Sequence, residues 1–305
     1  MTTEEKIQNS PSLLRLTNGI VDAWPAHRAF IDRHFSTLTP SEIAFLEVLA
    51  ARMLALIGDE LRRYADDYKW MCGFFLKYEM QVRRSKGALE HTDFDSIRAR
   101  YYQSDEQMGR YMRGLMISQI TWPQHAGAGM FLVQRFLPIL KGDYDYLEIG
   151  PGHGLYMSFA ANDPRCATLA GWDVAESSIH LTRHGLGRMG IDRGVSLELH
   201  DICSVAPLPE RFDAIVISQV LELVSSPKAA FDTIATLLRP GGRAFVNCPV
   251  KLLAPDHIRV WSGYEEIDEV AANSGLVKEE SDRILASSQA SYDDGYSYVA
   301  CFRKP

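Results

Sequence analysis

The chain has 305 residues, of which 46% are hydrophobic and 23% charged, a balance that is typical of globular proteins with an apolar core. The formal net charge is −7 and no basic stretch dominates its neighbourhood, which argues against nucleic acid as a partner because nucleic-acid binders rely on lysine and arginine at phosphates. The five cysteines form no CxxC pair, which favours a reducing compartment over a disulfide framework or a zinc site. The N-terminus is too polar for a signal peptide and no apolar run approaches the roughly 20 residues of a membrane span, so we expect a cytoplasmic protein.

From residue 12 to about residue 140 the apolar residues recur at steps of three or four, which predicts an all-helical region. The clearest helix start is Thr39, which can form a capping box with Glu42 and is followed by a proline in the first turn. The apolar pattern of this helix runs on to a stop near Gly87 and is compatible with a break at Gly58. Further helices are predicted over residues 93–103, 106–120 and 124–137, the last ending before Pro138.

Beyond residue 142, short β-rich runs alternate with helices, which predicts parallel strands joined by crossover helices in a three-layer α/β domain. The last two strands are separated only by a short turn-rich link, which predicts an antiparallel hairpin. A capping box between Ser262 and Glu265 is predicted to start the helix that precedes this hairpin. The predicted strands cover residues 144–149, 168–173, 196–200, 212–218, 243–248, 277–284 and 296–302.

A glycine-rich turn, E-I-G-P-G-H-G from Glu148 to Gly154, follows the first predicted strand. Glycines let a ligand lie against bare peptide groups, although such a turn is also compatible with a plain strand–helix connection. The G-x-G-x-G spacing differs from the dinucleotide fingerprint, because Leu155 stands where its third glycine would fall, and no G-K-S or G-K-T is present to form a P-loop. Asp173 and Asp201 end the second and third predicted strands, where one carboxylate suits the two hydroxyls of a ribose and the other an adenine amine.

Together with F-D-x-x-x at Phe212 and L-x-P-G-G at Leu238, these motifs resemble those of class I S-adenosylmethionine-dependent methyltransferases of the small-molecule type, over about residues 125–305. The resemblance implies an α/β fold with a seven-stranded Rossmann-like sheet, mostly parallel with an antiparallel last strand, preceded by an all-helical cap over residues 1–124. S-adenosyl-L-methionine is the implied cofactor. The residues carried over to it are Glu148, which opens the motif, Gly150 and Gly152 at the methionine portion, Asp173 at the ribose, Val174 beside the adenine, Asp201 and Ile202 at the adenine edge, and Gln219 near the sulfonium.

The chain departs from this family pattern after the fourth predicted strand. Many small-molecule members have Leu-Glu-His there, whereas this chain has Leu223 in place of the histidine, so no role of that histidine carries over. Glu222 either faces the substrate or is a solvated carboxylate at a helix start, and the dipole at a helix N-terminus favours the second interpretation.

Methyl transfer mainly needs alignment and exclusion of water, and it needs a base only where the acceptor loses a proton. His257 is the first candidate base, because its loop leaves the sheet edge where ligands bind; Asp256 or another carboxylate could orient it, and the alternative is a loop histidine bonded to backbone. His125 is the second candidate, with an ordinary helix-start residue as the alternative. Most aromatic residues of the helical region are expected in the core, and the candidates for the acceptor pocket are Tyr101, Tyr111 and Trp122.

The sequence thus predicts an enzyme that methylates a small, partly apolar acceptor, such as a natural-product intermediate, with no metal, nucleic acid or membrane involved. Two alternatives stay open: a non-catalytic S-adenosylmethionine-binding protein, and an NAD-dependent dehydrogenase, which the glycine spacing disfavours. Surplus apolar surface between Trp70 and Tyr78 predicts that the helical region both closes the pocket and contacts a second subunit in a homodimer.

Overall fold

The computed structural model describes residues 3–85, 105–191, 194–204, 209–287 and 289–305 of the chain. The described residues before the sheet form helices, as the sequence predicts. These elements are α1 (Thr3–Ile7), α2 (Pro11–Ala23), the 3-10 turn η1 (Pro25–His27), α3 (Arg28–Thr37), α4 (Pro40–Ile57), α5 (Leu61–Arg84), α7 (Asp105–Thr121), α8 (Pro123–Phe131), the π-helical turn η3 (Leu132–Phe136) and α9 (Leu137–Ile139).

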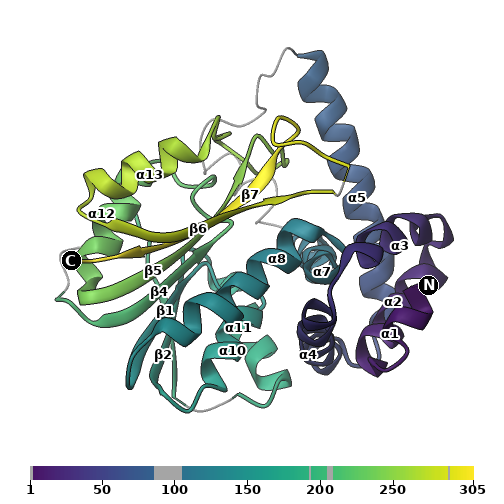
Figure 1. The fold of residues 1–305 in the computed structure, drawn as a ribbon, viewed down its shortest axis with the longest axis horizontal. Coiled ribbons are helices and arrows are strands. Elements are labelled where there is room, and N and C mark those ends of the chain that lie inside the picture. The colour runs from purple at the N-terminus through teal and green to yellow at the C-terminus, as the bar shows by residue number, and fades with distance from the viewer. Residues whose placement is uncertain (1–2, 86–104, 192–193, 205–208, 288) are drawn as a thin grey trace.

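Strands and helices then alternate up to the closing hairpin. Their bounds are β1 (Tyr144–Ile149), α10 (Leu155–Ala161), β2 (Cys166–Asp173), α11 (Glu176–Arg188), β3 (Val195–Leu199), β4 (Phe212–Ser218), α12 (Pro227–Leu237), β5 (Leu238–Val250), α13 (Tyr264–Asn273), β6 (Val277–Leu285) and β7 (Tyr296–Arg303). Figure 1 shows the sheet with α12 and α13 on one side of the molecule, α1 to α5 on the other, and α7 and α8 between them.

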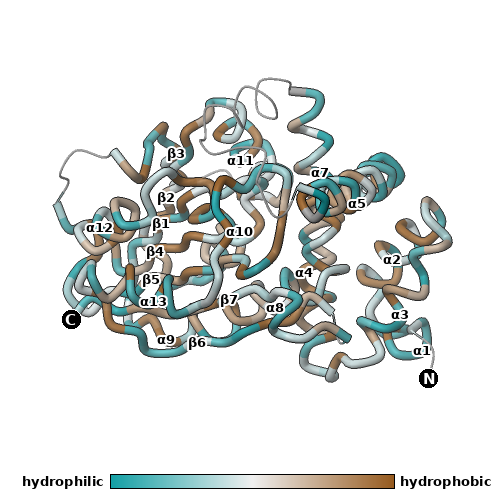
Figure 2. Tube along the Cα trace, turned by 90° about the horizontal axis from the view of Figure 1, so that it is seen from above, coloured by the Kyte–Doolittle hydropathy of each residue, from teal (hydrophilic) through white to brown (hydrophobic). Residues whose placement is uncertain are grey.

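The seven strands form one sheet in the order β3-β2-β1-β4-β5-β7-β6. Strands β1 to β5 pair in parallel, whereas β7 pairs antiparallel with both β5 and β6. This confirms the predicted seven-stranded, mostly parallel sheet with its antiparallel last strand and closing hairpin. Figure 2 shows hydrophobic residues concentrated along β1, β2 and β4 in the middle of the sheet. Because the strand order reverses between β1 and β4, a crevice is expected beyond the carboxyl ends of these two strands.

Two terminal signals determine where α4 begins and ends. The capping box is formed: the amide of Glu42 donates to Thr39 Oγ1 at 3.3 Å and the amide of Thr39 donates to Glu42 Oε2 at 2.6 Å. Gly58, at φ 62°, ends the helix, because a left-handed residue cannot continue the helical backbone. The chain therefore breaks between α4 and α5, at the position that the sequence pattern left open.

Two predicted helix boundaries differ from the structure, and one further predicted helix is not tested by it. The helix expected to stop before Pro138 extends to Ile139, because the π-helical turn places Pro138 in the first turn of α9, where its missing N–H costs no bond. The capping box at Ser262 is wrong: Gly263 is the N-cap of α13, and Ser262 lies one position outside the helix, with its hydroxyl bonded to Glu266. The helix predicted over residues 93–103 lies outside the described residues.

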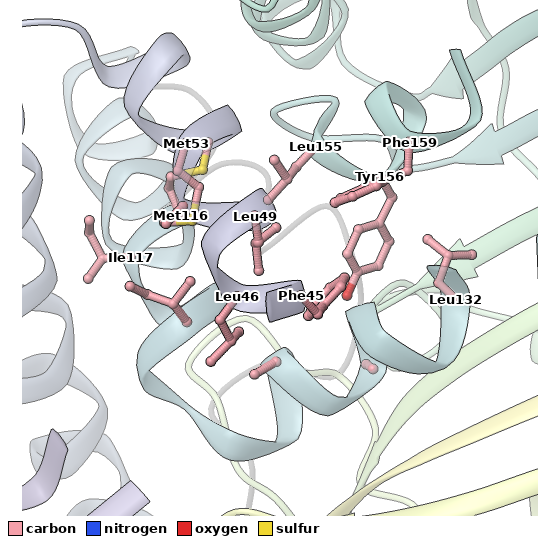
Figure 3. Packing of buried hydrophobic residues seen from close by; sticks show 14 of the residues in the cluster. Phe45, Leu46, Leu49, Met53, Met116, Ile117, Leu132, Leu155, Tyr156 and Phe159 are labelled. Atoms are coloured by element: carbon pink, nitrogen blue, oxygen red, sulfur yellow. The ribbon is translucent and has the colours of Figure 1, made fainter. Parts of the chain in front are cut away.

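One hydrophobic cluster continues from the helical region into the α/β part (Figure 3). The guanidinium of Arg52, on α4, adds a polar link by donating to the backbone oxygen of Ser158 at 2.9 Å and to its Oγ at 3.1 Å. The two regions predicted as residues 1–124 and 125–305 therefore share a core along this interface. The residues that meet there include Phe45, Leu46, Leu49 and Met53 of α4 and Leu155, Tyr156 and Phe159 of α10.

Within the described ranges of the chain, no helix combines the length and the apolar character that crossing a bilayer would require.

Candidate active site

A cavity of about 660 Å³ lies at the carboxyl ends of the parallel strands. Loops after β1 to β5 line one side of it, and residues of α5, α7 and the start of α8 line the other. Tyr101 lies outside the described residues, so the structure does not place this candidate. The cavity brings together the other residues predicted from the sequence, namely Glu148, Gly150, Gly152, Asp173, Val174, Asp201, Ile202, Gln219, Tyr111, Trp122, His125 and His257.

The glycine turn presents bare backbone to this cavity. Gly150, Gly152 and Gly154 have φ values of 66°, 53° and 74°, a left-handed conformation that side chains with a Cβ rarely adopt. A Cβ at Gly150 would also lie 2.5 Å from Val220 Cγ2, and one at Gly152 would lie 3.0 Å from Met112 Cε. The turn therefore requires glycine for both its backbone conformation and its surroundings.

Helix α11 holds the turn from behind. The hydroxyl of Thr182 donates to the carbonyl oxygen of Gly152 at 2.7 Å. Gly185, one helical turn further on, packs directly on the turn, because a Cβ there would lie only 2.3 Å from the carbonyl oxygen of His153. The position of the glycine turn is thus fixed by contacts that α11 makes with the backbone of the turn.

Acidic residues follow β2 and β3 at the same edge, as predicted. Asp173 Oδ1 accepts from the amide of Ala175 at 3.1 Å, and burial raises the pKa of Asp173 to about 6. Asp201 Oδ1 accepts from the amide of Cys203 at 2.8 Å. Between these carboxylates lies an apolar surface to which the buried Ile202 and the partly exposed Val174 contribute.

The ends of β1 and β4 add two further polar groups. Glu148 is buried, accepts from the hydroxyl of Tyr146 at 2.8 Å, and has its pKa raised to about 8 by this burial. Gln219 has φ 56°, and its side-chain Nε2 is buried without a hydrogen-bond partner. Bare glycine backbone, the Asp173 carboxyl and the Asp201 carboxyl fit the methionine, ribose and adenine parts of S-adenosylmethionine, the implied cofactor. The unsatisfied amide of Gln219 is a free donor in the same lining.

Glu222 corrects one interpretation of the sequence. Its side chain lines the cavity, is 1% exposed, and leaves Oε2 without a partner, so the solvated helix-start carboxylate is wrong. The physical reason is that α12 begins only at Pro227, with Ser226 as its N-cap, so Glu222 lies in the turn after β4 and faces inward. Burial raises the pKa of Glu222 well above its ordinary value.

Asp256 reaches the cavity from the loop after β5. Its Oδ2 accepts from the hydroxyl of Tyr111, on α7, at 2.9 Å, whereas its Oδ1 has no partner. The amide of Ile258 donates to the carbonyl oxygen of Glu222 at 3.2 Å, which joins the loops after β4 and β5. The two carboxylates therefore belong to one wall of the cavity.

The two candidate histidines are buried and largely neutral. The ring of His257 bonds to the backbone of Leu252, and burial lowers its pKa; Asp256 bonds to Tyr111 instead and does not orient His257 through a hydrogen bond. His125 Nδ1 lies 2.8 Å from Ser118 Oγ, and burial lowers its pKa to about 4. Because the hydroxyl of Ser118 donates to the Leu115 carbonyl, Nδ1 of His125 carries the proton and Nε2 is left as an acceptor. Both rings line the cavity, and their catalytic roles stay predictions.

An aromatic wall closes the cavity from the helical side. Trp122 donates from Nε1 to the hydroxyl oxygen of Tyr68 at 3.0 Å, and that hydroxyl contacts His27 Nε2 at 2.8 Å. Burial lowers the pKa of His27 to about 4, so Nε2 is free to accept from Tyr68 and the indole is fixed through this chain. Phe75 packs on Trp122 and Tyr111 with ring centroids 5.7 and 6.0 Å away.

Several lining residues were not singled out from the sequence. A polar residue within the apolar run of β5 is a readable signal for Asn247, whereas the others contact the cavity only through tertiary packing. They include Phe75, Met108, Met112, Gln124, Tyr156 and Asn247.

Residues 128–272 match a family model described as a methyltransferase domain. The ubiquinone biosynthesis O-methyltransferase of Xylella fastidiosa is 36% identical over 110 residues, which is 35% of this chain and 43% of the relative. The corresponding protein of Aeromonas salmonicida is 30% identical over 105 residues, 33% of this chain and 41% of the relative. The chain thus spans less than half of the length of these relatives.

Two solved structures share the fold at a TM-score of 0.51. The N-methyltransferase NodS of Bradyrhizobium japonicum, in complex with S-adenosyl-L-homocysteine, is 21% identical and covers 70% of this chain and 100% of its own. The cyclase SpnF is 20% identical and covers 60% of this chain and 82% of its own. The family match agrees with the strand order and the glycine turn, and with S-adenosylmethionine as the cofactor. Residues 128–272 thus match a methyltransferase domain, and the strand order and the glycine turn support a class I S-adenosylmethionine-dependent methyltransferase.

Proposed function

We propose that the chain transfers a methyl group from S-adenosylmethionine to a small, partly apolar acceptor enclosed between the sheet and the helical region. The observation that carries this proposal is the cavity of about 660 Å³, which has the glycine turn on one side and the aromatic wall on the other. Pockets that enclose small ligands have volumes of about 300–1,000 Å³, whereas a polymeric substrate needs an open surface.

One set of the chain's residues would bind the cofactor and another set would bind the acceptor. When bound, the cofactor supplies a methyl group on a sulfonium, which is already a good leaving group. Gly150 and Gly152 would hold its methionine portion and Asp173 its ribose hydroxyls. The aromatic wall would exclude water and align the acceptor, and these are the main requirements of methyl transfer. His257 and His125 are neutral groups in the cavity that could receive a proton where the acceptor loses one.

The relatives support a small acceptor, since two of them are ubiquinone biosynthesis O-methyltransferases, and a natural-product intermediate is compatible with the apolar wall. SpnF, a cyclase, shows that the fold alone does not determine the reaction. Turnover therefore has to be measured directly.

The test uses the purified full chain, with calorimetry for S-adenosylmethionine, S-adenosylhomocysteine and NAD. A cell extract is divided by dialysis into small molecules, which pass the membrane, and RNA and protein, which are retained. The chain is then incubated with methyl-labelled S-adenosylmethionine and one of these two fractions. We expect tight binding of the first two ligands and label in the small-molecule fraction. Tight binding with no labelled product would support the non-catalytic alternative, and NAD binding would support the dehydrogenase.

The predictions about assembly and location stay proposals. On α5, Leu76 is 59% and Met80 47% exposed, an apolar surface that a homodimer contact would cover. Light scattering of the purified chain tests this contact, and fractionation of cells tests the proposed cytoplasmic location.

A further inference from the structure

The cavity lining contains more carboxyl groups than binding of the cofactor requires. Among the described residues that line it there is no lysine or arginine. Burial lowers the pKa of His125 and of His153 to about 4 and also lowers that of His257, so these rings supply no positive charge at neutral pH. The fourth histidine of the lining, His200, follows β3 in the cofactor half and contacts Glu198 Oε2 at 3.0 Å. The lining includes five carboxyl groups, those of Glu148, Asp173, Asp201, Glu222 and Asp256.

The strand order divides these carboxyl groups into two sets. Glu148, Asp173 and Asp201 follow or end β1, β2 and β3, which form the cofactor half of the cavity. Glu222 and Asp256 follow β4 and β5, on the other side of the strand reversal, and Tyr111 of the aromatic wall bonds directly to Asp256. The second pair therefore belongs to the acceptor half.

This pair has unused hydrogen-bond capacity. Glu222 is 1% exposed and Asp256 7%, yet Oε2 of the first and Oδ1 of the second have no partner. Two amide oxygens of the same cavity lining, Asn247 Oδ1 and Gln124 Oε1, are likewise buried and unpartnered. A buried acceptor without a donor costs about 1–3 kcal/mol, and more when it is charged, so this wall is built for a ligand that donates hydrogen bonds.

We propose that Glu222 and Asp256 form an acidic subsite that binds the protonated amine of the methyl acceptor, so that the substrates of this enzyme are small amines with an apolar body. The inference rests on the proposed methyltransferase function and specifies its substrate class. An ammonium group can donate to both carboxylates, and its charge offsets theirs where no protein cation does so. The rings of Tyr111, Trp122 and Phe75 suit both the apolar body and a cation beside them. Acceptors that carry a carboxylate or phosphate would find no lysine or arginine among the described residues of the lining to pair with.

The raised pKa of Glu222 agrees with this assignment, because an isolated buried carboxyl is held neutral until a cation stabilises its charge. Asp256 and the thiol of Cys248 are the other titratable groups that interact with Glu222, and neither can provide a positive charge.

The test uses the full chain and follows methyl label from S-adenosylmethionine into the small molecules of an extract of the source organism, which are collected as the fraction that passes a dialysis membrane. Labelled products are separated from the cofactor and then applied to cation and anion exchangers. We expect the product on the cation exchanger. Glu222→Gln and Asp256→Asn should each lower the rate by about tenfold or more, the loss expected for one charge-assisted hydrogen bond, while the Kd for S-adenosylhomocysteine changes by less than about twofold. The matched control is Asp232→Asn, which neutralises an exposed carboxylate paired with Lys228 on α12 and should change neither quantity.

Each other outcome contradicts a different statement. A neutral or anionic product, or wild-type rates in both variants, would overturn the amine subsite and leave the methyltransferase function standing. Loss of S-adenosylhomocysteine binding in the variants would assign the pair to the cofactor and overturn the proposal as well. No labelled product from any fraction would instead overturn the proposed function. If a variant does not fold, the charge of the product made by the wild-type chain still tests the amine subsite.

Discussion

Gly185 is the position at which helix α11 is most sensitive to a single added atom. In Gly185→Ala, the new Cβ would lie 2.3 Å from the carbonyl oxygen of His153 and 3.2 Å from Leu56 Cδ1. Cβ contacts below 3.0 Å are essentially never observed, so helix and turn must separate by at least about 0.7 Å, the difference between these two distances. The obstructing atom is backbone of the glycine turn, so the displacement moves the cofactor site itself.

Overpacking of a filled position costs about 1–3 kcal/mol, and we expect the free energy of unfolding of Gly185→Ala to fall by this amount. The carbonyl of Gly152 accepts from Thr182, on the same helix, so the shift should also raise the Kd for S-adenosylhomocysteine by about tenfold, which corresponds to about 1.4 kcal/mol. Gly187→Ala is the matched control. It lies two residues further along α11, and its Cβ would meet nothing within 4 Å. It should raise the stability by about 0.5–1 kcal/mol and leave the affinity unchanged.

Urea unfolding and calorimetry with S-adenosylhomocysteine measure the two quantities on both variants. Equal changes of stability and affinity in the two variants would refute the reasoning. Helix propensity affects both variants, whereas the contact with the glycine turn affects only Gly185→Ala. Wild-type affinity in a destabilised Gly185→Ala would show that α11 supports the fold without positioning the cofactor turn.

Asp173→Ala should weaken S-adenosylhomocysteine binding by about one to two orders of magnitude with the fold intact, because each charge-assisted bond to the ribose contributes about 1.5–3 kcal/mol at most. The pKa of Asp173 is raised to about 6, and only its carboxylate form accepts from both ribose hydroxyls. The affinity of the wild-type chain for S-adenosylhomocysteine should therefore weaken as the pH falls through about 6. The same pH dependence in Asp173→Asn would assign this effect to another group. Gly152→Val should lose cofactor binding before it loses stability, because the residue has φ 53° and its Cβ would crowd Met112; normal binding in calorimetry would contradict the role of the turn. Deleting residues 1–120 should abolish acceptor methylation by removing most of the aromatic wall. A monomeric fragment that still turns over, shown by light scattering and label transfer, would contradict the prediction that the helical region closes the pocket.

The cofactor half of the site could be predicted from the sequence because its signals are local. Glycines with positive φ at the end of β1 and the carboxylate at the end of β2 are dictated by the few residues around them. The strand pattern also predicted β1 and β4 to the residue. Strand β5 is longer than expected because Leu238 pairs with Phe212 of β4 at one end, and Pro249 and Val250 pair with β7 at the other.

The acceptor half depends on contacts between distant residues and could not be predicted in the same way. Tyr111 and Asp256 are 145 positions apart, and nothing near either residue indicates their hydrogen bond. Glu222 was a partial exception. The Ser226-Pro227 pair is a readable N-cap signal, and it places the start of α12 too late for Glu222 to be the solvated residue that we expected.

Tyr111 and Met112 are consecutive residues of α7, and they lie over the two halves of the cavity. Tyr111 bonds to Asp256 in the acceptor half, and Met112 approaches Gly152 in the cofactor half. One outward displacement of this helix would therefore uncover both halves of the cavity, and the spent cofactor and the methylated product would leave through the same opening. We expect product release and not methyl transfer to limit the steady-state rate, with a burst in the first turnover and a dependence of kcat on solvent viscosity. We also expect a high acceptor concentration to inhibit turnover, because an acceptor that refills its half early would retain S-adenosylhomocysteine beneath α7.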